Sequence, residues 1–190
     1  MLNLYKSIEI LVSLQLLIIT AMLPIYIPLP LINKSINSFE IPITWQITTI
    51  IFLTLIFNSK VVFRAYTIYI FLGLFISPVF HEGGSLGYLL TPNFGYLLGV
   101  YPLIKIIDKL NKKNNINIGN FLINGFLAIC AMHLTGVIYN FIQIIYYNQF
   151  NIFLYNLGKY SVGKIGYHLI MLFPLILLIK PIKYFKYNKK

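Results

Sequence analysis

Residues 78–99 have the sequence PVFHEGGSLGYLLTPNFGYLLG, which sets five glycines among prolines and aromatic residues in the middle of an apolar chain. Glycine permits left-handed backbone and close approach of chains, and successive backbone N–H groups can form a nest that binds an anion. Gly95 and Gly99 have the spacing of a close helix–helix contact, whereas Gly83 and Gly84 suit either a turn or a ligand-binding nest. The segment therefore predicts closely packed helices next to a polar loop.

The chain on either side of this segment is too apolar for a water-soluble protein. Of its 190 residues, 58% are hydrophobic and 10% are charged, and the mean hydropathy is +0.80. Soluble domains carry about 25% charged residues. The net charge of +11 is better explained by membrane insertion and anionic lipid than by nucleic acid, because the basic residues gather on one side of the predicted helices. The single cysteine, Cys130, excludes an intramolecular disulfide. We therefore expect an all-α integral membrane protein that contacts lipid and binds no nucleic acid.

Six apolar stretches are long enough to cross a membrane as helices. They are Ile8–Leu31, Ile41–Phe57, Val61–Phe80, Gly87–Ile107, Gly119–Ile145 and Ile165–Phe185. If the N-terminus is inside, twelve of the 15 Lys and Arg residues lie on the inner side, which is the side that basic residues favour. The sequence therefore predicts a single six-span domain, residues 1–190, with both termini inside. Pro24, Pro28 and Pro30 predict a kinked or extended outer end of the first span. The segment Tyr146–Lys164 is expected to be an outer connection.

Residues able to carry out catalysis or bind a metal are few. His81, His133 and His168 lie far apart and lack metal-ligand spacing, so neither a metal site nor a cofactor is expected. His133 lies in the middle of the fifth span, which favours an interhelical hydrogen bond over a ligand or proton role. Ser85 paired with His133 or His168 leaves an intramembrane serine hydrolase as a distant alternative, but a serine among glycines suits a turn better. The stretch GKYSVGKI, Gly158–Ile165, lacks the Ser or Thr of a nucleotide-binding P-loop.

Three segments resemble one family of membrane proteins, the biotin-specific S component (BioY) of energy-coupling-factor vitamin transporters. The family's glycine-rich signature runs roughly GGxxGYLLGPTGGYLxG. The residues that keep it here are Gly83, Gly84, Gly87, Tyr88, Leu89, Leu90, Pro92, Gly95, Tyr96, Leu97 and Gly99. IPITWQ at Ile41–Gln46 is similar to the family's VPxTxQ opening of the second span. YIFLGLFISPVF at Tyr69–Phe80 is similar to its Tyr-xxx-Gly and PVF run.

The chain departs from the family pattern near its expected ligand motif. Thr91 stands where the family usually has glycine. The family introduces its sixth span with a PGDxxK-like motif, whose Asp and Lys are expected near the ligand. The corresponding VGKIGY, Val162–Tyr167, has Lys164 at the Asp position and Tyr167 at the Lys position. An S component for a different small vitamin or solute is therefore the nearest alternative.

The resemblance implies a function in vitamin uptake and no enzymatic activity. It implies a substrate-binding membrane subunit that takes up biotin from the outside for import, in a bacterial or plastid inner or plasma membrane. The energy would come from separate ATPase subunits acting through a transmembrane coupling subunit. A solitary mode without dedicated ATPases stays open.

Biotin has an apolar ring body, a ureido group with two donors and one acceptor, and a valerate carboxylate. A matching site needs aromatic walls, amide or hydroxyl partners, and a cation or an N–H nest for the carboxylate. The outer half of the predicted bundle contains such groups. We predict that the substrate-binding residues are Thr44, Gln46, Phe80, Gly83, Gly84, Tyr88, Asn93, Tyr96 and Lys164.

Overall fold

The computed structural model describes residues 4–30, 36–111, 117–147 and 150–188, and 82% of it is helical. The helices are α1 (Leu4–Met22), α2 (Gln46–Ile56), α3 (Ser59–Phe75), α4 (Pro92–Leu98), α5 (Val100–Asn111), α6 (Ile118–Tyr147), α7 (Phe150–Asn156), α8 (Gly163–Ile170) and α9 (Leu172–Asn188). Two antiparallel strands, β1 (Pro24–Pro30) and β2 (Ile36–Thr44), form a hairpin. A 3₁₀ turn, η1 (Leu86–Leu90), precedes α4, and a π-helical segment, η2 (Leu157–Val162), joins α7 to α8.

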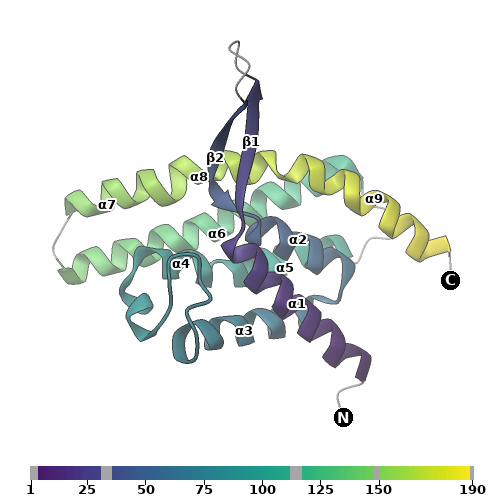
Figure 1. Ribbon diagram of the computed structural model, residues 1–190, viewed down its shortest axis with the longest axis horizontal. Coiled ribbons are helices and arrows are strands. Elements are labelled where there is room, and N and C mark those ends of the chain that lie inside the picture. The colour runs from purple at the N-terminus through teal and green to yellow at the C-terminus, as the bar shows by residue number, and fades with distance from the viewer. Residues whose placement is uncertain (1–3, 31–35, 112–116, 148–149, 189–190) are drawn as a thin grey trace.

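The helices form one bundle from which the β1–β2 hairpin projects (Figure 1). Helices α7, α8 and α9 follow one another along the upper edge of the view, and α6 packs against α4, α5 and α7. Helix α1 packs against α3, and α2 packs against α5. Helix α1 begins and helix α9 ends on the same side of this view, so the two ends of the described chain lie on the same side of the bundle.

Three helical segments are long and apolar enough to cross a membrane. They are Leu4–Met22, Ile118–Tyr146 and Phe150–Pro181. Large apolar side chains stay exposed along them, among them Ile19, Ile123, Leu134 and Leu177. Contiguous exposed apolar surface of this kind is unfavourable in water and expected against lipid chains. The mostly helical chain is a membrane protein.

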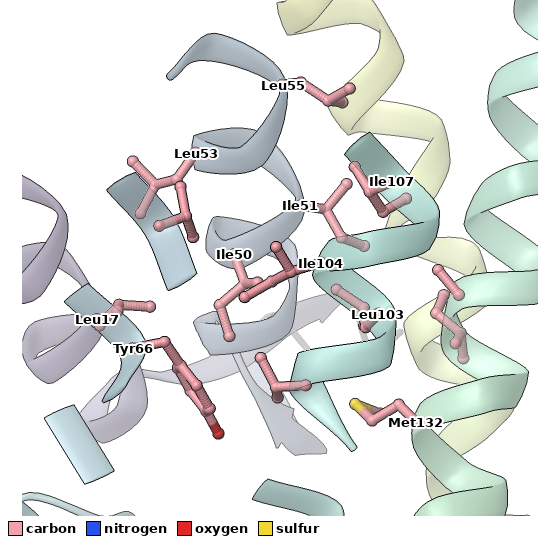
Figure 2. Close-up of a cluster of buried hydrophobic side chains, with 14 of the residues drawn as sticks. Leu17, Ile50, Ile51, Leu53, Leu55, Tyr66, Leu103, Ile104, Ile107 and Met132 are labelled. Carbon is pink, nitrogen blue, oxygen red and sulfur yellow. The ribbon is translucent and has the colours of Figure 1, made fainter. Parts of the chain in front are cut away.

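The hydrophobic core lies where α1, α2, α3, α5, α6 and α9 meet. Figure 2 shows Ile50 and Ile51 of α2 facing Ile104 and Ile107 of α5, and all four side chains are buried. Helix α2, QITTIIFLTLI, is apolar around most of its circumference, which is the pattern of a helix enclosed by its neighbours. The core therefore forms around α2, and the start of α2 at Gln46 is fixed relative to the helices around it.

The outer end of the first predicted span is extended, as its prolines indicate. Helix α1 ends at Met22, and Pro24–Pro30 form strand β1, because proline lacks the N–H group that a continuing helix needs. Strand β2 takes up the start of the second predicted span, so α2 begins at Gln46 rather than at Ile41. The fourth predicted span, Gly87–Ile107, is divided into η1, α4 and α5.

The segment predicted as an outer connection, Tyr146–Lys164, is helical in most of its described residues, because it contains α7 and η2. It contains no proline, and of its glycines Gly158 lies in the widened helical turn η2 and Gly163 begins helix α8. Helix α7 packs against α6, and its apolar side chains Phe150, Ile152 and Leu154 stay exposed. The helical segment from α7 to α9 therefore begins well before the sixth predicted span, Ile165–Phe185.

The close contact predicted from Gly95 and Gly99 is confirmed. A Cβ atom on Gly99 would lie 2.4 Å from the carbonyl oxygen of Met132, and one on Gly95 would lie 2.3 Å from the Cβ of Tyr139. Both neighbours belong to α6, so the two glycines let α4 and the start of α5 approach it closely.

We expect Gly99→Ala to destabilise the protein by about 1–3 kcal/mol, because the added methyl group meets backbone that cannot move aside. Thermal unfolding in detergent would measure the change. Gly166→Ala is the matched control: Gly166 lies in α8 with nothing within 4 Å of an added Cβ atom. Equal unfolding temperatures for the two variants would contradict this account of the α4–α6 contact.

Candidate substrate-binding site

A cavity of about 110 Å³ lies where the foot of the hairpin, α2, α3, α4, α6 and the η2–α8 segment meet. Five aromatic rings form much of its wall: Tyr69, Phe80, Tyr88, Tyr96 and Tyr160. Ile43, Ile47, Leu97, Val100 and Met132 add apolar surface. The polar side chains that line it are Thr44, Gln46, His81, Glu82, Asn93, His133, Lys164 and His168.

Seven of the nine residues predicted from the sequence line this cavity. They are Thr44, Gln46, Phe80, Tyr88, Asn93, Tyr96 and Lys164. The structure does not bring Gly83 and Gly84 into the lining. The cavity therefore gathers residues from four separate parts of the chain.

Thr44 and Gln46 reach the cavity because strand β2 ends where helix α2 begins. Trp45 lies between them, and its backbone N–H donates to the carbonyl oxygen of Leu23 at 3.3 Å, which ties the junction to the end of α1. Gln46 is 7% exposed, and its Nε2 has no hydrogen-bond partner within the described part of the chain. A buried amide nitrogen without a partner costs free energy, and a ligand that accepts its hydrogen bond would recover that cost.

Phe80 is held in the wall by the turn that follows it. The backbone N–H groups of Phe80 and Gly83 each donate to the other's carbonyl oxygen, at 2.9 and 3.0 Å, and Gly83 has φ of 117°. The N–H of Gly83 is thus used within the turn. The Phe80 ring fills the space where Gly73 of α3 has no side chain, and it contacts Tyr69 and Tyr88 with ring centroids 5.3 and 4.7 Å away.

Gly84 packs against helix α3 rather than facing the cavity. A Cβ atom there would lie 2.6 Å from the carbonyl oxygen of Gly73 and 2.6 Å from the Cα of Pro78. The glycine pair of the signature therefore shapes the loop that carries Phe80, and this geometry favours its turn interpretation over a ligand-binding nest.

Asn93 and Glu82 pair at the exposed side of the cavity. The side-chain nitrogen of Asn93 donates a hydrogen bond to Glu82 Oε2, which links the start of α4 to the loop after Phe80. Glu82 and its neighbour His81 are exposed. Sequence reasoning missed Glu82 as a lining residue, although it supplies a carboxylate in a site where Lys164 replaces the family's Asp.

Lys164 is partly buried and lines the cavity from α8. Its Nζ lies 5.3 Å from the centre of the Tyr160 ring, and the Nζ of Lys159 lies 4.8 Å from the same ring. Cations over an aromatic face are attracted by its quadrupole. Lys159 is exposed and is not one of the lining residues, so two neighbouring lysines share one ring but only Lys164 faces the site.

A short hydrogen-bonded chain joins Tyr96, Ser161 and His133. The Tyr96 hydroxyl lies 2.9 Å from Ser161 Oγ, which lies 3.2 Å from His133 Nδ1. Ser161 belongs to η2, so the interhelical hydrogen bond predicted for His133 is confirmed. Widened π-helical turns occur frequently at functional sites, and this one places Tyr160 and Ser161 beside α6.

Ser85 does not form the catalytic pair that a serine hydrolase would need. His133 and His168 line the cavity and lie next to each other, with ring centroids 5.6 Å apart, whereas Ser85 is outside the lining. Its φ of 95° and the donation of its backbone N–H to the carbonyl oxygen of Gly73 fit a turn residue.

Comparison with known proteins identifies the family. A family model described as "BioY family" matches residues 2–173 of this chain. The chain belongs to the BioY family. A BioY relative from Lysinibacillus sphaericus, described as a probable biotin transporter, is 26% identical over 121 residues, which are 63% of this chain. The match spans 57% of that relative's length.

The fold of this chain is also seen in a solved structure. The crystal structure of the S-component for biotin from an ECF-type ABC transporter superposes with a TM-score of 0.64 at 18% identity. The match covers 97% of this chain and 95% of that one. The two proteins therefore share their fold over nearly their whole length.

Several lining residues of this BioY chain were not predicted as ligand contacts. Tyr69, Met132, Tyr160 and His168 come from helices whose side chains face each other only after folding. For His168 a signal existed, since an ionisable residue inside a membrane segment usually marks a functional position.

Proposed function

We propose that this chain is the substrate-binding S component of a vitamin transporter and that it takes up biotin from the outside for import. The cavity and the chemistry of its lining are the observation on which this proposal rests. It offers aromatic walls for the ring body, an unpartnered amide nitrogen on Gln46 for the ureido group, and Lys164 for the carboxylate. These are the groups that an amphipathic, carboxylate-bearing ligand requires. Membership of the BioY family supports biotin as that ligand.

The site proposed for biotin comprises the seven predicted residues that line the cavity. Gly83 and Gly84 support it indirectly by shaping the loop that holds Phe80. Energy for import would come from ATPase subunits and a transmembrane coupling subunit on separate chains, or the chain would work alone. The likeness in fold to an S component of an ECF-type transporter supports the first arrangement.

A vitamin other than biotin is the alternative that a specific observation favours. Lys164 and Tyr167 stand where the family has Asp and Lys, and Tyr167 packs against the hairpin residues Ile25, Ile41 and Ile43 instead of lining the cavity. Uptake of radiolabelled biotin into bacteria that express the chain, with a panel of unlabelled vitamins as competitors, separates the two. We expect uptake of labelled biotin that depends on the chain and that only unlabelled biotin reduces, and uptake no greater than in cells without the chain would reject biotin as the substrate.

We also propose a single six-span domain with both termini on the inner side of a bacterial plasma membrane. In this topology α4 and α5 together make the fourth span, and the segment from α7 to α9 makes the sixth. The bias of basic residues supports the orientation, as does the common side at which α1 begins and α9 ends (Figure 1).

Cysteine labelling in intact cells tests this topology. Ser85 would be outside and Asn58, between α2 and α3, would be inside. After Cys130→Ser, a membrane-impermeant maleimide should label Ser85→Cys in intact cells and Asn58→Cys only after lysis. The reverse pattern would overturn the orientation.

A further inference from the structure

Two neighbouring histidines are among the buried polar residues of the cavity. His133 of α6 is 4% exposed and His168 of α8 is 8% exposed, with ring centroids 5.6 Å apart. The residues beside them in the lining, Val100 and Met132, are also buried. This pair forms a buried polar part of the cavity wall.

Each of the two rings has a nitrogen that no protein group satisfies. Within the described part of the chain, His133 Nε2 and His168 Nδ1 are buried and have no hydrogen-bond partner. The only other nitrogen of a lining residue in the same state is Gln46 Nε2. Buried polar atoms in folded proteins are nearly always paired, so unpaired atoms on residues of one cavity indicate that a ligand pairs them.

The charged groups of the cavity are less buried than the two histidines. Glu82 and His81 are exposed, and Lys164 is partly buried. Burial therefore increases from Glu82 and His81, through Lys164, to the two histidines, and Lys164 lies about one helical turn before His168 on α8. A ligand that matches these groups has a carboxylate for Lys164 and an uncharged polar ring for the histidines.

The hydrogen-bonded chain Tyr96–Ser161–His133 allows His133 Nε2 to be either a donor or an acceptor. If Tyr96 donates to Ser161 and Ser161 donates to His133 Nδ1, then Nε2 carries the proton and is a donor. If the chain runs the other way, Nε2 is an acceptor. An uncharged urea or ring amide presents both N–H donors and a carbonyl acceptor, so it can pair with the histidines in either arrangement.

We infer that His133 and His168 determine specificity by hydrogen-bonding an uncharged urea or ring-amide group of the ligand in the cavity. The carboxylate of that ligand then faces Lys164. This inference rests on the proposed function, in which the ligand is biotin and the group is its ureido ring. It assigns a role to two residues that the family's signature segments do not contain.

The test measures equilibrium binding of radiolabelled biotin to the full chain in detergent, together with competition by biotinamide, whose carboxylate is replaced by an uncharged amide. His133→Leu and His168→Leu should each weaken biotin about tenfold or more, because a buried ureido hydrogen bond is lost. Their preference for biotin over biotinamide should equal that of the unmodified chain. Lys164→Met should instead lose that preference.

Two further variants control for folding. Thr135→Val removes a hydroxyl from the same helix that bonds only within α6, to the carbonyl oxygen of Ala131, and should leave biotin affinity within about twofold. His133→Gln keeps a donor and an acceptor and should bind biotin more tightly than His133→Leu. The unliganded His168→Leu chain should unfold at no lower temperature than the unmodified chain, because an unpaired buried nitrogen is removed.

The outcomes separate this inference from the proposed function. If both leucine variants bind biotin within twofold of the unmodified chain, the role of the histidines is overturned. Biotin would then still be the ligand. Loss of the biotin–biotinamide preference in those variants would overturn the orientation. An unmodified chain that binds no biotin would overturn the proposed function, and this inference with it.

Discussion

Replacing Lys164 with methionine is expected to weaken biotin binding by about 10- to 100-fold, the usual effect of removing a charged hydrogen-bond partner. Lys164 is the one lysine among the lining residues of the described chain, and it is partly buried beside the Tyr160 ring. A carboxylate that enters the cavity therefore loses its cationic partner in this variant. Titration with radiolabelled biotin would measure the change in Kd.

Lys159→Met provides the matched control for this prediction. Lys159 lies over the same Tyr160 ring, at 4.8 Å, but is exposed and outside the cavity lining. Net charge changes equally in the two variants, so a general electrostatic effect would weaken both. If Lys159→Met and Lys164→Met bind biotin equally well, the assignment of Lys164 to the carboxylate is incorrect.

Phe80→Ala is expected to lower the free energy of unfolding by about 3–5 kcal/mol and to abolish measurable binding. The ring is 2% exposed, fills the space above Gly73 and contacts both Tyr69 and Tyr88. Its removal leaves a void in the aromatic wall and frees the turn that follows it. Thermal unfolding in detergent and biotin titration would measure the two effects.

Phe126→Ala tests whether any lost phenyl ring has this effect. Phe126 lies on α6 and is 49% exposed, so its ring faces the surroundings of the bundle rather than its core. We expect its loss to change stability by less than about 1 kcal/mol. A comparable drop in unfolding temperature for both variants would show that Phe80 has no special place in the wall.

Helices without interruptions could be predicted closely from the sequence. The predicted span Gly119–Ile145 differs from α6 by one residue at its start and two at its end, because its apolar run contains no proline and few charges. The helix contact at Gly95 and Gly99 was also predictable, since small residues four apart permit close packing.

Segments rich in proline or glycine were harder to predict, because the same residues suit more than one structure. Pro24–Pro30 indicated an extended end but not that it pairs with Ile36–Thr44 as a hairpin. Tyr146–Lys164 was expected to be a connection between spans, yet most of its described residues are helical. Pairing and helix continuity depend on tertiary contacts that local sequence does not encode.

The candidate site was predictable where one segment carried several of its residues, and less so where residues meet across the bundle. Thr44, Gln46, Tyr88 and Tyr96 lie in recognisable segments and line one cavity. His168 reaches the same cavity from a helix far along the chain, and only the fold brings it next to His133. Long-range juxtaposition of this kind has no local sequence signal.

The central claim is that this cavity binds biotin, and equilibrium binding of radiolabelled biotin to the purified chain tests it most directly. Trp45, the sole tryptophan, lies between Thr44 and Gln46, so its fluorescence provides an independent readout of the same site. We predict saturable, submicromolar binding that unlabelled biotin displaces and that changes the Trp45 emission. A monodisperse, thermally stable chain that binds no biotin would contradict the claim.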